Sequence, residues 1–109
     1  MKEKCRYIVA RVDAGNKPTR EQIEAACIYA VFRLYGVVGL SKLRPSLAFY
    51  DKEKQLCAFK VLRNNYREFV LALDLMPRQG VNLRPLKTTG TLRKAIRIIA
   101  SIPKGKQLV

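Results

Sequence analysis

Two hydrophobic periods alternate along this chain, one typical of strands and one typical of helices. Residues 6–12 alternate at every second position and are rich in β-branched types, which predicts a first strand. After a turn, Thr19 stands three residues before Gln22, which is the capping-box spacing that opens a helix. The apolar stripe of this helix recurs at helical spacing, at Ile23, Ala26, Cys27, Ala30, Val31 and Leu34.

We expect this first helix to end at Gly36, because glycine readily adopts the left-handed conformation that closes helices. Three more apolar residues lie beside the stripe, so the helix is expected to be buried on more than one side; they are Ile28, Tyr29 and Phe32. A loop with two glycines is expected over 36–42.

The remaining pattern predicts two strands, a helix, a fourth strand and a last helix. Pro45 places the start of the second strand at an edge or a bulge, and a polar turn joins that strand to the third as a hairpin. Asn64 or Asn65 is expected to cap the second helix, and Pro77 to end it. The expected strands cover 43–50, 55–63 and 81–87, and the last helix covers about 92–102.

The element order β-α-β-β-α-β-α indicates an α+β sandwich. Its first six members match the split β-α-β arrangement of ferredoxin-like folds, a four-stranded antiparallel sheet with two helices on one face. The third strand is apolar on both faces, with Leu56, Ala58 and Leu62 on one and Cys57, Phe59 and Val61 on the other. Such a strand should be covered on both sides, so we expect the C-terminal helix or a protein partner over the second face. The length of 109 residues fits a single domain, with a basic tail from about residue 103.

Charge is distributed unevenly along the chain. The sequence has 22 Lys and Arg against 8 Asp and Glu, a net charge of +14. Acidic residues end at Asp74, whereas basic residues continue with Arg78, Arg84, Lys87, Arg93, Lys94, Arg97, Lys104 and Lys106. Segregated positive charge favours a polyanionic partner, most commonly nucleic acid.

The residue types argue against an intrinsic active site. The chain has no histidine, and its three cysteines have no CxxC spacing, so neither a disulfide framework nor a zinc or other metal site is indicated. The acids are scattered, and no glycine-rich phosphate motif is present. No uninterrupted apolar run reaches 18 residues, and no signal peptide is visible, so we expect no membrane span and a cytoplasmic location.

The last helix is the strongest candidate for contact with nucleic acid. Arg93, Lys94 and Arg97 share one sector, and the opposite side holds Leu92, Ala95, Ile96, Ile98, Ile99 and Ile102. Thr89 or Thr91 can cap the helix, whose first N–H groups suit a phosphate.

Recognition of bases by stacking is not indicated by the strands. The third strand has one aromatic residue, Phe59, where the RNP1 pattern requires several, although Tyr7 and Phe59 could share a face. We therefore expect recognition of the nucleic-acid backbone and shape rather than of individual bases.

Several segments occur together in the order of a known family. They are Arg6-Tyr7, the run from Phe32 to Lys42 (FRLYGVVGLSK), Val61-Leu62-Arg63-Asn64-Asn65, and Thr88-Thr89-Gly90-Thr91-Leu92-Arg93-Lys94. Over about residues 5–100 the chain resembles the archaeal ribonuclease P protein component 2 family, which eukaryotes share. The resemblance implies an RRM-like fold and a non-catalytic, RNA-binding protein subunit of ribonuclease P. That enzyme removes the 5′ leader from precursor tRNA, and its catalyst is an RNA working with Mg²⁺.

The resemblance also implies partners and contact residues. The partners are the ribonuclease P RNA, the TIM-barrel protein subunit called component 3 and a second copy of the chain, with precursor tRNA contacted indirectly; the protein itself binds no cofactor. The second sheet face and the 36–42 loop are candidate surfaces for protein contacts. The expected RNA-binding residues are Lys42, Arg63, Arg67, Arg93, Lys94 and Arg97, with Lys104 and Lys106 in the tail beyond the matched region. Where the family often has a basic residue after Arg63, this chain has Asn64-Asn65, and Arg67 can substitute.

Two other functions share parts of this pattern. A general RNA-binding, architectural or ribosomal protein would have the same basic composition without preference for one RNA. A small acylphosphatase-like enzyme would have the same fold, but its phosphate loop is not visible in the sequence.

Overall fold

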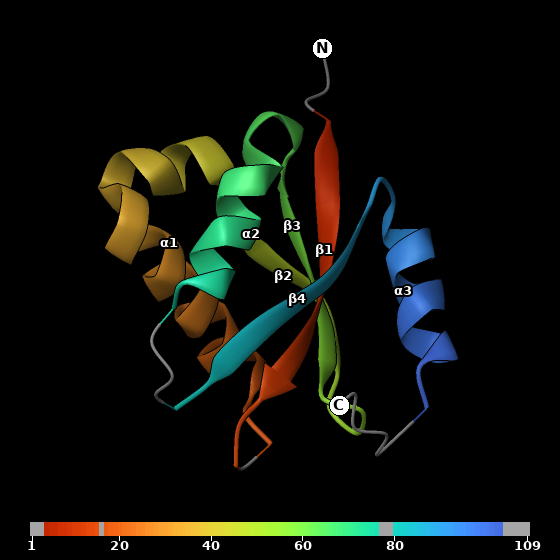
Figure 1. The fold of residues 1–109 in the computed structure, drawn as a ribbon. Helices are drawn as coiled ribbons and strands as arrows, with labels where there is room; N and C mark the ends of the chain where they lie inside the picture. The colour runs from red at the N-terminus through yellow and green to blue at the C-terminus, as the bar shows by residue number, and fades with distance from the viewer. Residues whose placement is uncertain (1–3, 16, 77–79, 104–109) are drawn as a thin grey trace.

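A computed structural model describes residues 4–15, 17–76 and 80–103. The strands form one antiparallel sheet in the order β2-β3-β1-β4, with bounds β1 (Cys5–Asp13), β2 (Ser46–Asp51), β3 (Leu56–Leu62) and β4 (Asn82–Thr89). Two helices, α1 (Arg20–Leu43) and α2 (Tyr66–Asp74), cover one face, and α3 (Leu92–Ser101) lies on the other (Figure 1). This confirms the predicted α+β sandwich and its element order.

The first helix begins as predicted, breaks at Gly36 and then continues as a second helical segment. Thr19 accepts a hydrogen bond from the Gln22 N–H, and the Gln22 side chain accepts one from the Thr19 N–H, which completes the capping box. Gly36 (φ 68°, ψ −161°) leaves helical geometry and divides α1 into two helical segments, which bears out the predicted end of the first segment, but the predicted loop over 36–42 is wrong because a second segment follows at once. The residues after the bend return to helical geometry, and the helix ends at Arg44, which is in the left-handed conformation before Pro45.

The outer surface of α1 is not buried, contrary to the expectation from its apolar composition. Tyr29 is 55% exposed and Phe32 49% exposed, and Ile28 and Leu34 are exposed as well. The sheet can contact only one side of a helix, and here that contact buries Ile23, Cys27, Ala30 and Val31. By length and composition α1 could also cross a membrane, a test that the core helix of a globular domain passes as well.

The second helix starts differently from the prediction. A 3₁₀ turn, η1 (Arg63–Asn65), precedes α2, and Asn65 occupies the cap position without a side-chain hydrogen bond. The α2 helix ends at Asp74, and the predicted stop, Pro77, lies outside the described residues.

The two faces of the sheet build two separate cores. Phe59 packs edge-on against Phe69 of α2, with ring centroids 5.5 Å apart, in the larger core beneath α1 and α2. Tyr7 faces α3 instead, because it pairs with Lys60 while its neighbour Ile8 pairs with Phe59. The idea that Tyr7 and Phe59 share a face is therefore wrong.

Helix α3 covers the second sheet face, as the two-sided apolar pattern of β3 predicted. Ala95 and Ile99 are buried against Val9, Leu56 and Ala58. Ile96 was assigned to this packing side but is 37% exposed, because it lies at the edge of the stripe, toward the cations. At the C-terminal end of α3, the Lys54 ammonium donates hydrogen bonds to the carbonyl oxygens of Ile99 and Ala100, at 3.0 and 3.1 Å.

Candidate nucleic-acid interface

Antiparallel pairing brings three chain junctions to one end of the sheet. β1 begins there, and β3 and β4, which run antiparallel to β1, both end there. The connections from α1 to β2, from β3 to α2 and from β4 to α3 therefore meet at this end, which is the upper end in Figure 1. We call it the basic end; its described cations are Lys4, Arg6, Lys42, Arg44, Lys60, Arg63, Arg67, Arg93 and Lys94.

Most of the predicted RNA-binding residues belong to this end. Lys42 is in the last turn of α1, Arg63 starts the η1 turn, and Arg67 is in the first turn of α2. Arg93 and Lys94 are in the first turn of α3, and Arg97 follows one turn later. These residues are far apart in the sequence, and the sheet topology brings them together. Lys104 and Lys106 lie outside the described residues.

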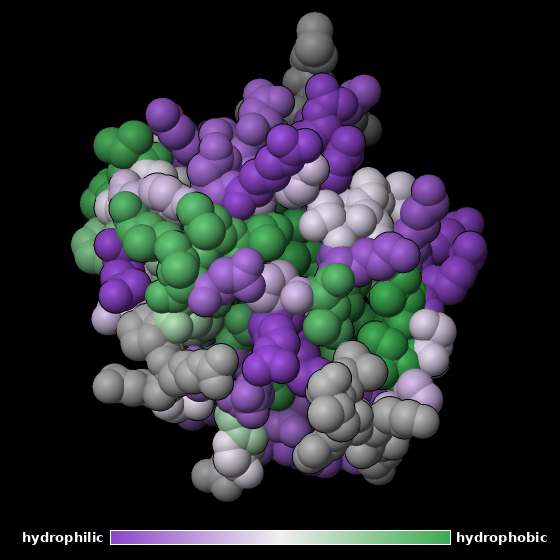
Figure 2. Space-filling view, viewed as in Figure 1, coloured by the Kyte–Doolittle hydropathy of each residue, from purple (hydrophilic) through white to green (hydrophobic). Residues whose placement is uncertain are grey.

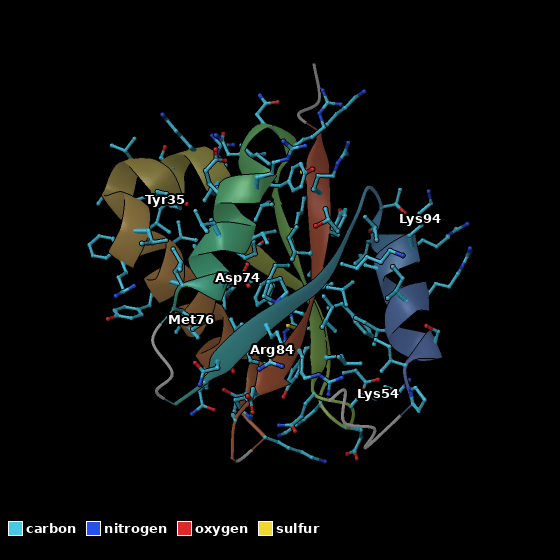
Figure 3. The ribbon with its side chains drawn as sticks, in the orientation of Figure 1. Tyr35, Lys54, Asp74, Met76, Arg84 and Lys94 are labelled. Atoms are coloured by element: carbon cyan, nitrogen blue, oxygen red, sulfur yellow. The ribbon has the colours of Figure 1, made fainter. Side chains whose placement is uncertain are left out.

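The charged groups at this end are available to a partner. Among the described residues, no hydrogen bond or ion pair involves the side-chain charges of Lys42, Lys60, Arg63 or Lys94, and all four residues are exposed. Lys94 extends away from the body of the molecule (Figure 3). Arg67 differs, because its Nε donates to the Tyr66 hydroxyl at 3.4 Å and its guanidinium lies 5.7 Å from the Tyr66 ring centroid.

Acidic side chains gather at the opposite end of the molecule. Of the acids that the structure describes, only Glu68 belongs to the basic end. The ends of β1, β2 and α2, the β2–β3 turn and the first turns of α1 hold the others: Asp13, Asp51, Asp74, Glu53, Glu21 and Glu24. Two of the cations there have protein partners: Lys17 forms an ion pair with Glu53 at 3.4 Å, and Arg20 donates to the Leu47 carbonyl at 3.1 Å. The fold therefore separates charge along the strand direction.

The start of α3 has the cap that the sequence predicted. The Thr91 hydroxyl accepts a hydrogen bond from the Lys94 N–H at 3.2 Å, and the Thr89 hydroxyl donates to the Thr91 carbonyl at 2.9 Å. Thr91 is therefore the capping residue. No acidic side chain occurs in this helix, so nothing in α3 neutralises its three cations.

A nucleophilic or metal-dependent site is not visible in the described part of the chain. Burial raises the pKa of the Cys27 thiol to about 12, and burial also raises the pKa of Cys57, so both stay protonated near neutral pH. No group of three metal-binding side chains was found among the described residues. The cleft between the bent end of α1 and the start of α2, about 270 Å³, is largely apolar, with Lys42, Asn65 and Glu68 in its lining.

Sequence reasoning did not single out Lys4, Arg6, Arg44 and Lys60 as part of this surface. The Arg63 N–H donates to the Lys4 carbonyl at 2.9 Å, which places these two residues side by side. The position of a Cβ on Gly90 would lie 3.6 Å from Arg6 Nη1, so Arg6 reaches the start of α3. Strand alternation could have placed Lys60 opposite Tyr7, but only the β1–β3 register decides it.

The Rpp14/Pop5 family model matches residues 6–100, which include all of these junctions. The chain belongs to the Rpp14/Pop5 family. The matched region ends before the tail that carries Lys104 and Lys106.

Two curated relatives of this family member are archaeal. The chain is 26% identical over 100 residues to the ribonuclease P protein component 2 of Pyrococcus furiosus, a match that covers 89% of this chain and 83% of that protein. It is 28% identical over 101 residues to the protein of the same name from Aeropyrum pernix, covering 88% and 82%. A chain in the cryo-EM structure of yeast ribonuclease MRP has the same fold, with a TM-score of 0.59, 11% identity, and coverage of 92% of this chain and 89% of that one.

Proposed function

We propose that this member of the Rpp14/Pop5 family is a non-catalytic protein subunit of ribonuclease P that contacts the enzyme's RNA through the basic end. The observation that carries the proposal is the convergence of cations without protein partners at one end of the sheet, in a chain whose family model covers residues 6–100. Such cations displace the counterions condensed on RNA phosphates, which favours binding.

The chemistry of leader removal would belong to the RNA. Mg²⁺ ions held by that RNA would activate the attacking water and stabilise the leaving oxygen. The protein would place Lys and Arg side chains at fixed positions, where they neutralise RNA phosphates. Arg63 and Arg93 can each engage a phosphate through two N–H groups, whereas Lys42, Lys60 and Lys94 act as point charges. This arrangement lowers the repulsion between RNA segments that must approach one another, and precursor tRNA would be contacted only indirectly. The protein would work in the cytoplasm, beside its RNA.

Protein partners would bind the outer surface of α1 and α2. This layer has equal numbers of opposite charges, with Arg20, Arg33, Lys42 and Arg67 against Glu21, Glu24, Glu68 and Asp74. Nearly all the large exposed apolar side chains of the described residues lie on it, among them Tyr29, Phe32, Leu71 and Leu75. Figure 2 shows hydrophobic surface over α1 and α2. A neutral, apolar surface suits protein contacts, and the occupants we propose are the TIM-barrel component 3 and a second copy of the chain.

Reconstitution tests the proposed function directly. The catalytic RNA and the other protein subunits are combined with and without this chain, and precursor-tRNA cleavage is measured at low and high Mg²⁺. We expect the protein to be required at low Mg²⁺ and to matter less at high Mg²⁺, because excess cations replace part of its screening. Equal cleavage with and without the protein at low Mg²⁺ would contradict the proposal.

The RNA that copurifies with the protein distinguishes this function from a general architectural or ribosomal role. One abundant structured RNA would support a ribonuclease P subunit. A broad mixture of RNAs, or ribosomal RNA, would instead favour the alternative, which the basic composition alone fits equally well.

A further inference from the structure

Helix α3 covers only part of the second sheet face. Val9 and Ala58, which pair with each other, are fully buried beneath it. One row closer to the basic end, Tyr7 pairs with Lys60; Tyr7 is half-buried and Lys60 is exposed. The next row, Cys5 and Leu62, is also only half-buried. We call these four side chains, Cys5, Tyr7, Lys60 and Leu62, the open sheet patch.

Positive charge surrounds the open sheet patch. Lys4 and Arg63 lie directly beyond it and are joined by the backbone hydrogen bond of 2.9 Å between them. Arg6 pairs with Val61 and leaves β1 on the opposite face, but its guanidinium reaches Gly90 beside β4, and Lys94 follows in the first turn of α3. Among the described acids, the one at this end, Glu68, is on α2, across the sheet. In Figure 2 the upper end of the molecule is correspondingly hydrophilic.

We infer that the open sheet patch binds an unpaired RNA nucleotide, whose base stacks on Tyr7 and whose flanking phosphates contact Lys60 and Arg63. This inference rests on the proposed RNA contact at the basic end and adds a single-stranded element to it. The neighbouring aliphatic side chain Leu62 extends the apolar floor on which a base can lie.

The chemistry of the patch favours an unpaired base over a duplex. A tyrosine on a sheet face can stack only on a base that has left its own helix, whereas duplex RNA presents phosphates and ribose hydroxyls. Stacking accepts any base, so the site would select unpaired RNA without selecting its sequence. The cations of the basic end would bind both forms of RNA, but the patch would distinguish them.

Binding of two RNA probes tests the inference. One probe is a short RNA without internal pairing, and the other is a short RNA duplex, both measured at the same salt concentration. We expect Tyr7→Leu to weaken binding of the single strand about tenfold, because one stacked base loses its partner. Binding of the duplex should remain nearly unchanged. Tyr7→Phe keeps the ring and should bind the single strand almost as wild type does. Tyr29→Leu, on the outer surface of α1, is the matched control and should change neither probe.

A second variant avoids the contact between Tyr7 and α3. Lys60→Met retains an unbranched apolar stem but removes an exposed charge, so it leaves the core intact. It should lower the affinity for the single strand and reduce the salt slope by about one. A probe carrying photoreactive 4-thiouridine should crosslink to the peptide that contains Tyr7.

The outcomes separate this inference from the proposed function. Retained duplex binding with an unchanged single-strand affinity in Tyr7→Leu and Lys60→Met would overturn the stacking site alone. Equal losses on both probes would also overturn it, because they would show a general effect. Failure of the wild-type protein to bind either probe would overturn both proposals. Protection of the patch by protein subunits in the absence of RNA would assign it to a protein contact and contradict the inference.

Discussion

Burial determines the chemistry of the cysteines more than their sequence positions do. Cys27 is packed in the core beneath α1, and burial, with a smaller effect from Glu24, raises the pKa of its thiol from 9.0 to about 12. Cys57 on β3 also has a raised pKa, because it is buried and lies near Cys27. The sequence predicted Cys27 as a core residue, and the structure confirms it.

These raised pKa values predict a loss of stability at high pH. Below pH 9 the Cys27 thiol is protonated in both the folded and the unfolded chain, so its ionisation does not lower the free energy of unfolding. Between pH 9 and about 12 the unfolded chain ionises first, and the free energy of unfolding falls. Urea denaturation at pH 8 and pH 10.5 should show this fall, and Cys27→Ala should reduce the difference between the two pH values.

The control for this prediction is Cys5→Ala, which retains both buried thiols and should keep the wild-type pH dependence. Alanine at position 27 also leaves a small cavity that lowers stability at every pH, so the pH dependence, and not the stability itself, is the measure. An unchanged dependence in Cys27→Ala would contradict the prediction.

The bend in α1 shows how an element can depend on two small residues. Gly36 supplies a positive φ that the helix needs in order to turn, and Gly39 lets the bent segment approach Tyr35. The Tyr35 hydroxyl then donates to the Glu68 carbonyl at 3.0 Å, which ties the bend to α2. The bend exposes Val37 and Val38, at 71% and 65%, on the neutral apolar layer.

Gly39→Ala should destabilise this bend. The added Cβ would collide with the Cβ of Tyr35, so the two helical segments must move apart, at a cost of about 1–3 kcal/mol. Gly15→Ala is the control, because nothing lies within 4 Å of its Cβ position, and it should change stability by less than about 0.5 kcal/mol. Thermal denaturation of both variants measures the difference. Equal melting temperatures would show that a Cβ at position 39 fits beside Tyr35.

Helix α3 is held at its C-terminal end by a side chain from the β2–β3 turn. Lys54→Met removes its two hydrogen bonds to α3 carbonyl groups and its favourable interaction with the helix dipole, a loss of about 0.5–1 kcal/mol. We expect faster hydrogen exchange in the last turn of α3. Lys52→Met, an exposed lysine of the same turn, should leave that exchange rate unchanged. Equal exchange rates in the two variants would show that Lys54 does not stabilise the C-terminal end of α3.

At the scale of the whole molecule, charge is separated in two directions. Along the strands, cations are concentrated at one end and most described acids lie at the other. Across the sheet, the α1 and α2 layer is neutral and apolar outside, whereas α3 has three cations and no acid. RNA and protein contacts can therefore occupy different surfaces of a molecule that measures 38 × 31 × 24 Å.

This separation predicts that the position of a charge matters more than the total charge. The triple variant Arg93→Ala, Lys94→Ala, Arg97→Ala and the control Lys17→Ala, Lys52→Ala, Arg84→Ala each remove three positive charges. The first should reduce the salt dependence of RNA binding by about one unit of slope for each lost phosphate contact. The control removes cations from the opposite end and should reduce the slope less. Equal slopes in a salt titration would mean that only net charge is recognised.

The sequence by itself determined the type and order of the elements, because periodicity and caps are local. The capping box at Thr19, the cap at Thr91 and the two-sided apolar pattern of β3 each report on a few neighbouring residues, and each prediction was confirmed. The break at Gly36 was predicted, but the helical segment after it was missed, because a glycine that ends a helix and one that joins two helical segments look alike in sequence.

Only the tertiary structure decided which apolar residues are exposed and which cations meet. Phe32 and Cys27 are both apolar members of α1, but one side alone can face the sheet. Lys42, Arg63 and Lys94 are separated by at least 21 positions, and antiparallel pairing of the strands places their three junctions at one end. The partial cover of the sheet by α3, which leaves Tyr7 beside Lys60, depends on strand register and helix length together, and neither is encoded in any single segment.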